Sequence, residues 1–79
     1  MIKINDTLIN GLKKVVISKK PTSPLLEITL FGSSDIDLNL FLNKTVSIKK
    51  DDGLLIKKLY IYIIYEEKDK YIIFGEEKD

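Results

Sequence analysis

Apolar and polar residues alternate along much of this 79-residue chain. The alternation is regular in residues 1–4, 25–31 and 45–49, where every second residue is Ile, Leu or Val. Side chains along a β-strand point alternately to opposite faces, so this spacing is typical of strands with one buried face. We therefore expect short strands in all three stretches.

The most apolar stretch is Leu59–Tyr65, which contains no charge, proline or glycine. In a regular strand, one face would carry the side chains of Leu59, Ile61, Ile63 and Tyr65. The opposite face would carry Tyr60, Tyr62 and Ile64. Both faces are apolar or aromatic, and the charged pairs Lys57-Lys58 and Glu66-Glu67 flank the stretch. This pattern predicts a central strand covered on both sides, with flanking charges that oppose aggregation.

Turn residues separate the expected strands. Asn10-Gly11 lies between Thr7–Ile9 and Leu12–Lys19, and Asn-Gly favours a hairpin because both residues tolerate positive φ. Asn5-Asp6 and Asp51–Gly53 indicate two further turns. Residues 19–24 contain two prolines, which lack a backbone donor and end a strand.

Residues 35–43 allow two interpretations. Ile36, Leu38, Leu40 and Leu42 alternate as in a strand. Ser34 followed by Asp37 instead resembles a capping box before a short helix. We favour a loop with one helical turn near residues 36–42 and keep the strand as the alternative.

The sequence thus predicts an all-β fold, a small barrel of six or seven short and mostly antiparallel strands, with a β-sandwich as the alternative. We expect one domain over residues 1–79 with an acidic C-terminal end, because acids outnumber lysines in residues 66–79. A core of this size gives only about 3–5 kcal/mol of net stability. Binding to a protein partner or a second copy would add to it.

Composition excludes several kinds of chemistry. All 13 basic residues are lysine, and the chain has no histidine or cysteine. It therefore lacks an imidazole base, a thiolate nucleophile and the usual ligands of zinc or copper. Asp35 and Asp37 form too small an acidic set for a calcium loop, and a lone Ser-Lys pair such as Ser47 with a nearby lysine is indistinguishable from strand surface. We expect no enzyme activity, no metal site and no cofactor.

The sequence also bears on location. No apolar run approaches the roughly 18–20 residues that cross a membrane, and residues 1–6 lack the apolar core of a signal peptide. Without cysteine, nothing requires an oxidising compartment. We expect a cytoplasmic protein without membrane contact, or one assembled into a virion or injection particle.

The aromatic residues suggest interaction sites. Tyr60, Tyr62, Ile64 and Tyr71 are the candidate interaction residues, because tyrosine combines an apolar ring with a polar end. Four lysine pairs with nearby tyrosines would also suit single-stranded nucleic acid, through phosphate contacts and base stacking. Against this, the net charge is only +1, arginine is absent, and adjacent strand residues point to opposite faces.

Residues 24–48 resemble the first β-barrel of phage tail hub proteins and of the related type VI secretion spike proteins. The matching order is Ser23-Pro24, the strand 25–30, the Ser33-Ser34 break, Asp35–Leu38, the apolar 40–42, and Asn43-Lys44-Thr45-Val46. Asn43 stands where that family has a glycine, and Gly53 matches its following turn. The resemblance implies an oligomeric barrel used in ring assembly, without catalytic residues. We expect one such barrel in these residues, without the domains that follow it in the family.

We therefore predict a non-catalytic protein-interaction or assembly module, a structural component of a phage tail or contractile injection apparatus. One alternative is a small phage-encoded inhibitor of a host factor, suggested by the size and by an Ile-, Lys- and Asn-rich composition that fits an AT-rich genome. The other is a small barrel that binds single-stranded nucleic acid.

Overall fold

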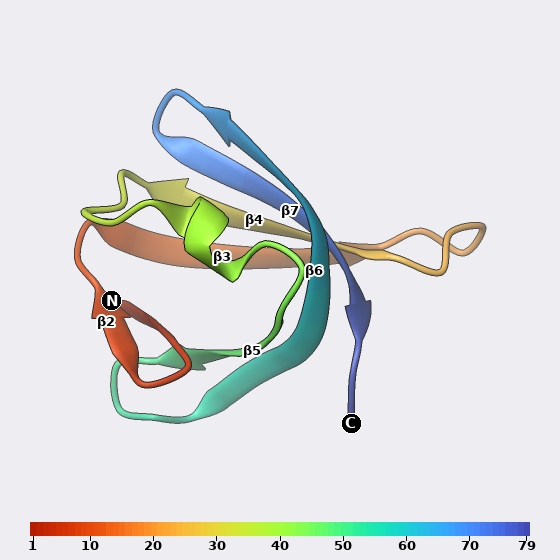
Figure 1. The fold of residues 1–79 in the computed structure, drawn as a ribbon, viewed down its shortest axis with the longest axis horizontal. Helices are drawn as coiled ribbons and strands as arrows, with labels where there is room; N and C mark the ends of the chain where they lie inside the picture. Colours follow the sequence, from red (N-terminus) through yellow and green to blue (C-terminus); the bar gives the residue numbers. More distant parts are fainter.

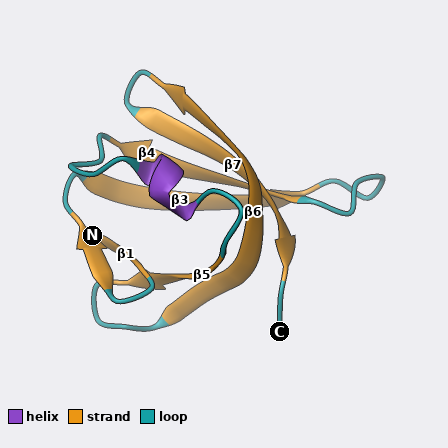
Figure 2. Cartoon of the chain, viewed as in Figure 1, coloured by secondary structure: helices purple, strands orange, loops and turns teal.

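A computed structural model describes residues 1–79 as a single antiparallel sheet of seven strands in the order β2-β1-β5-β6-β7-β4-β3. The strands curl around one interior, and the only helical element is a short 3₁₀ turn, η1 (Figures 1 and 2). The elements are β1 (Ile2–Ile4), β2 (Thr7–Ile9), β3 (Leu12–Lys19), β4 (Leu26–Gly32), η1 (Leu38–Phe41), β5 (Thr45–Lys50), β6 (Leu55–Glu67) and β7 (Lys70–Glu77). The predicted all-β barrel is confirmed. The strands form one curled sheet rather than the two packed sheets of a β-sandwich.

The core is aliphatic and comes from nearly every element. Ile28 and Leu30 of β4, Ile48 of β5, and Leu59 and Ile61 of β6 are fully buried. Further core residues are Ile2, Ile4, Ile9, Leu12, Leu38, Val46, Tyr71 and Ile73. The alternation in residues 1–4, 25–31 and 45–49 therefore placed the correct residues inside.

The Asn10-Gly11 hairpin prediction is wrong about which strands pair. β2 pairs with β1 through a turn at Asn5-Asp6, where Asn5 adopts a positive φ of 56°. β3 pairs instead with β4. Gly11 does have a φ of 93°, but its turn carries the chain from one end of the sheet to the other.

At this crossing Gly11 lies against the segment that leaves β4. A Cβ atom on Gly11 would lie 1.8 Å from the carbonyl oxygen of Ser33, and one on Gly32 would lie 2.0 Å from the carbonyl oxygen of Gly11. The backbone N–H of Ser33 donates to that same Gly11 oxygen at 3.2 Å. Only glycine leaves room for this contact. The contact continues the pairing of β3 with β4 beyond Leu12 and Gly32. The turn at Gly11 joins β2 and β3, the two ends of the sheet, and the sheet curls into a partly open barrel (Figure 1).

The 3₁₀ turn at Leu38–Phe41 confirms the helical interpretation of residues 36–42. Its N-cap is Asp37, whose carboxylate accepts from the backbone N–H of Asn39 at 3.0 Å. The capping box predicted from Ser34 is wrong, because the Ser34 hydroxyl bonds locally to the backbone of Ile36. Leu38 faces the core. The strand alternation in this stretch therefore does not indicate a strand.

Candidate interaction site

The outer side of β6 and β7 carries a cluster of partly exposed apolar side chains. Tyr62, Ile63 and Tyr65 of β6 have exposed fractions of 44%, 40% and 53%. Ile72 and Phe74 of β7 lie beside them, since Tyr65 pairs with Ile72 and Ile63 with Phe74. The rings of Tyr65 and Phe74 meet edge to face, with centroids 6.0 Å apart. We call these five residues the outer aromatic face.

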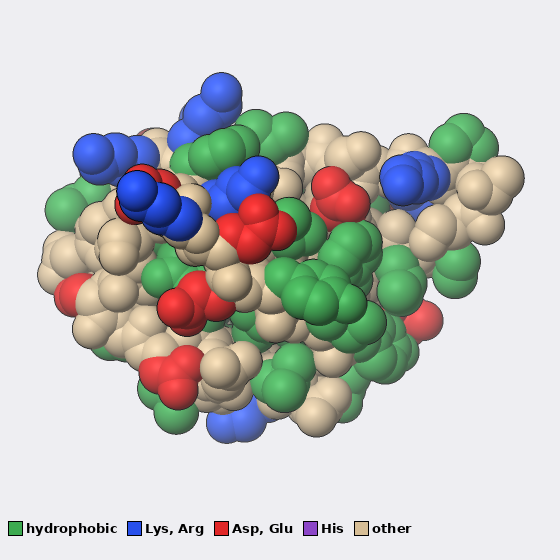
Figure 3. Space-filling view, turned by 90° about the horizontal axis from the view of Figure 1, so that it is seen from above, with side chains coloured by type: hydrophobic (Ala, Val, Ile, Leu, Met, Phe, Trp, Pro, Cys, Tyr) green, Lys and Arg blue, Asp and Glu red, His purple; other side chains and the backbone are tan.

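The apolar character continues across the sheet toward β3. Ile72 pairs with Thr29 of β4, and Thr29 pairs with Val16 of β3, which is 40% exposed. In the next row Lys70 pairs with Phe31, and the Lys14 ammonium lies 5.7 Å from the Phe31 ring centroid. Hydrophobic side chains gather in clusters between lysines and acids when the molecule is viewed from above the β6–β7 hairpin (Figure 3). Apolar side chains on the outer side therefore extend from β6 to β3, interrupted by Thr29 and by lysines.

A β-bulge in β6 determines which residues reach this face. Ile61 pairs with Gly75 and Ile63 with the next residue, Phe74, so Tyr62 is an extra residue in the ladder. One extra residue reverses the facing of everything after it. Ile64 therefore packs toward the core, whereas Ile63 and Tyr65 face outward. The face assignment for Leu59–Tyr65 is correct up to Ile61 and wrong for Ile63, Ile64 and Tyr65.

The structure separates the four predicted interaction residues. Tyr60 and Tyr62 lie together, with ring centroids 4.9 Å apart, and Tyr62 is exposed. Ile64 packs against the core, and Tyr71 is buried with an exposed fraction of 7%. The Tyr71 hydroxyl accepts from the backbone N–H of Ser34 at 2.9 Å. Tyr71 and Ile64 thus belong to the interior rather than to a surface site.

The predicted residues omitted Ile63, Tyr65 and Phe74. Their apolar character was visible, but a strand that is apolar on both faces gives no signal for which face is buried. A bulge leaves no clear mark in an uninterrupted apolar run either. Which of these side chains are exposed therefore depends on how β6 pairs with β7.

Charged residues surround the aromatic cluster in opposite-sign pairs. Glu76 pairs across the strands with Tyr60 and accepts from the Lys78 ammonium at 2.6 Å. This hydrogen bond, with the Coulomb attraction of the same carboxylate, raises the pKa of Lys78. Glu67 and Lys70 form a second pair at 3.5 Å, at the other end of the cluster. Glu76 therefore lies beside the two tyrosines, and Lys78 partly neutralises it.

The acidic residues considered for metal binding hold the backbone in place. Asp35 accepts from the backbone N–H and the side-chain amide of Asn10, at 3.1 and 3.0 Å. Asp37 caps η1. Asp52 accepts from the N–H of Leu54 at 2.9 Å, in the predicted turn between β5 and β6. Each carboxylate thus shapes a turn or a loop.

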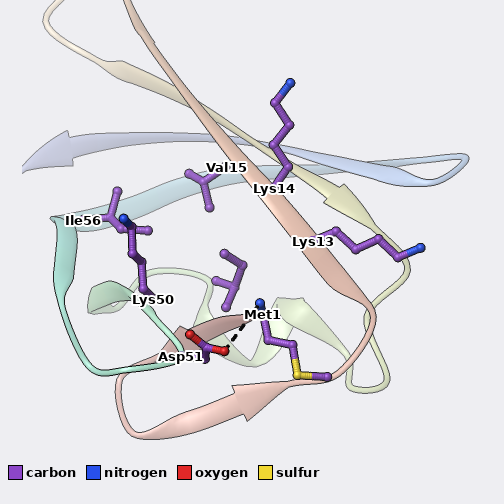
Figure 4. A pocket seen from close by; sticks show the side chains of 8 residues that line it. Met1, Lys13, Lys14, Val15, Lys50, Asp51 and Ile56 are labelled. Atoms are coloured by element: carbon purple, nitrogen blue, oxygen red, sulfur yellow. Dashed lines mark ion pairs between the residues drawn. The ribbon is translucent and has the colours of Figure 1, made fainter.

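A groove of about 390 Å³ lies between β3 and the strands β1 and β5 (Figure 4). Val15 of β3 and Ile56 of β6 lie on opposite sides of it. Its lining residues are Met1, Ile2, Lys13, Lys14, Val15, Lys50, Asp51 and Ile56. We call it the seam groove, because it follows the open seam of the barrel. It combines apolar walls with three lysines.

No family model, curated protein or solved structure matches the chain. No helix in the structure is long and apolar enough to span a membrane. Function must therefore be inferred from the surface of the chain itself.

Proposed function

We propose that this chain is a non-catalytic assembly module that binds protein through its outer aromatic face. The observation that carries the proposal is the exposure of Tyr62, Ile63 and Tyr65 on one contiguous side of the sheet. Interface cores are enriched in tyrosine and other aromatic residues and depleted in charge. Acids and lysines at the edge of the cluster suit the polar rim of such an interface.

A structural role in a phage tail or contractile injection apparatus is the setting we propose for this module. The resemblance of residues 24–48 to tail hub barrels supports it. Asn43, which replaces the family's glycine, has a φ of 60°, a conformation that glycine and asparagine adopt readily. The backbone at this position is therefore compatible with a glycine-containing relative.

The proposal is tested by disrupting the face without disturbing the core. Tyr65→Lys and Ile63→Lys each place a charge in the aromatic cluster, and Leu40→Lys on η1 is the control. Leu40 is 61% exposed and lies outside the cluster. The tagged chain is expressed in the cells that naturally produce it, and proteins recovered in stoichiometric amounts are quantified. Circular dichroism verifies that each variant is folded.

Loss of the bound protein from both face variants, with retention by Leu40→Lys, is the expected result. A second copy of the chain counts as a bound protein. The proposal is wrong if the wild type remains a monomer without a stoichiometric partner, or if Leu40→Lys loses the partner equally.

A further inference from the structure

Besides β2 at one end of the sheet, two strands of the barrel wall, β3 and β6, have an open edge. The strands β6, β7, β4 and β3 are neighbours in that order, and β3 ends the sheet. Pairing of β6 with β5 ends at Tyr60, and the backbone of Asn43 and Lys44 bonds only as far as Ile61. From Tyr62 to Glu67, β6 therefore has β7 as its only neighbouring strand. Open edges present unpaired backbone groups to another chain.

The two edges carry opposite charges. β3 contains Lys13 and Lys14, and Lys50 lies nearby in the seam groove. The open part of β6 ends in Glu66 and Glu67. Opposite charges directly across a strand pair stabilise it, and like charges destabilise it. Each edge therefore suits the other better than it suits itself.

We propose that β3 of one copy pairs with the Tyr62–Glu67 segment of β6 in a second copy. This inference rests on the proposed function and identifies a second copy of the chain as the partner. The strand directions alternate through β6, β7, β4 and β3, so a β6 segment added beside β3 in the same orientation is antiparallel to it. Adding copies in this way continues one antiparallel sheet.

The existing cross-strand rows indicate the register. One row contains Tyr65, Ile72, Thr29 and Val16, and the next contains Glu67, Lys70, Phe31 and Lys14. Continuing both rows places Val16 beside Tyr65 of the second copy and Lys14 beside Glu67 of the second copy. On the inner side, Ile17 then meets Ile64 of the second copy. Apolar residues face apolar ones, and the charged pair has opposite signs.

Symmetric pairing of β3 with itself is less favourable. In an antiparallel pair centred on Val16, Lys13 of each copy would stand opposite Lys19 of the other. The head-to-tail arrangement avoids this repulsion and leaves one open edge at each end of the assembly. Such a contact extends into a ring or an open filament.

The seam groove lies next to the first residues of β3, where Glu66 and Glu67 of the second copy would be placed. Val15 and Ile56 give it apolar walls, and Lys50 lies at its side (Figure 4). In the proposed register, Glu66 of the second copy lies beside Val15, on the side of β3 that faces the groove. Lys50 supplies a nearby opposite charge for that carboxylate.

Cysteine cross-linking tests the pairing directly, because the natural chain contains no cysteine. The doubly substituted protein Val16→Cys, Tyr65→Cys is oxidised and separated by non-reducing electrophoresis. Within one copy these positions are three strand spacings apart, roughly 14 Å, which exceeds disulfide reach. Any disulfide therefore joins two copies, and we expect a ladder of dimers, trimers and larger species.

The matched control is Val16→Cys, Ile63→Cys. Ile63 points to the same side of β6 as Tyr65 and has a similar exposure, but lies two residues, roughly 7 Å, along the strand. It should give little cross-linking. The inference is overturned if this control cross-links better, or if Val16→Cys alone gives dimers, which would indicate symmetric β3 pairing.

Charge reversal provides a second measurement on protein without cysteine. In sedimentation equilibrium, Lys14→Glu and Glu67→Lys should each weaken self-association about fivefold, and mixing the two variants should restore it. Lys58→Glu changes the net charge equally, on the part of β6 that is already paired with β5, and should have little effect. A monomeric wild type that still binds another protein through the outer aromatic face would overturn this inference alone and leave the proposed function standing.

Discussion

The side chain of Tyr71 lies inside the barrel. Its hydroxyl bonds to the backbone of a segment distant in sequence. Its hydroxyl accepts from the N–H of Ser34, in the loop between β4 and η1. The ring also contributes to the core. A residue predicted to make a surface contact therefore holds a loop in place from inside the barrel.

Removing this hydroxyl is expected to destabilise the fold. Tyr71→Phe leaves the Ser34 N–H without its acceptor and should lower the free energy of unfolding by about 1–2 kcal/mol. Tyr65→Phe is the matched control, because Tyr65 is 53% exposed and its ring contact with Phe74 is retained. It should change stability by less than about 0.5 kcal/mol. Urea denaturation measures both, and equal effects would contradict the role assigned to Tyr71.

At the residue level, alternation predicted burial well where one face of a strand is polar. Leu26, Ile28 and Leu30 are buried, whereas Glu27 and Thr29 are not. In Tyr71–Phe74 all four residues are apolar or aromatic, so their pattern does not indicate which two face inward. Burial there depends on the neighbouring strands rather than on local preference.

Among the elements, β6 is the longest strand, and its first half pairs with β5 while its second half pairs only with β7. The bulge at Tyr62 marks the transition between these halves. Bulges bend a strand and increase its twist. In β6 this lets one strand join both parts of the curled sheet (Figure 1).

Deletions within β6 test the bulge. Deleting Tyr62 leaves Leu59, Ile61 and Ile64 on the inner face by simple alternation, so the core residues remain inside. Deleting Tyr60 instead turns Ile61 outward and Tyr62 inward unless the pairing shifts. We expect the Tyr60 deletion to cost about 2 kcal/mol more than the Tyr62 deletion, the scale of losing a buried isoleucine. Thermal unfolding compares the two deletions. A more destabilising Tyr62 deletion would show that Tyr62 is not the extra residue of the bulge.

At the level of elements, the sequence identified the strands and turns better than their pairing. The turn at Asn10-Gly11 exists, but its flanking strands find partners elsewhere in the sheet. A turn signal describes local backbone geometry, whereas the close contact of Gly11 with Ser33 depends on segments far apart in sequence. The outer aromatic face could not be predicted for the same reason, since it depends on the β6–β7 register.

Over the whole molecule, charges are distributed by strand rather than gathered into one basic surface. The net charge is only +1. Tyr60 and Tyr62, the tyrosines best placed to stack on bases, lie beside an acidic strand end. Tyr60 pairs with Glu76, which forms an ion pair with Lys78. This ion pair leaves no net positive charge beside the tyrosine pair to attract phosphates.

We therefore expect no micromolar binding of single-stranded nucleic acid by the tyrosine pair, even at low salt. Phosphate contacts supply most non-specific affinity, and base stacking adds about 1–3 kcal/mol per base only once the strand is held. Fluorescence anisotropy with labelled oligo-dT and oligo-U measures binding by the wild type and by the Glu76→Lys variant. Replacing this acid should increase affinity if local charge is what prevents binding. Micromolar wild-type binding that disappears in Tyr60→Ala and Tyr62→Ala would establish the nucleic-acid alternative and count against a purely protein-binding module.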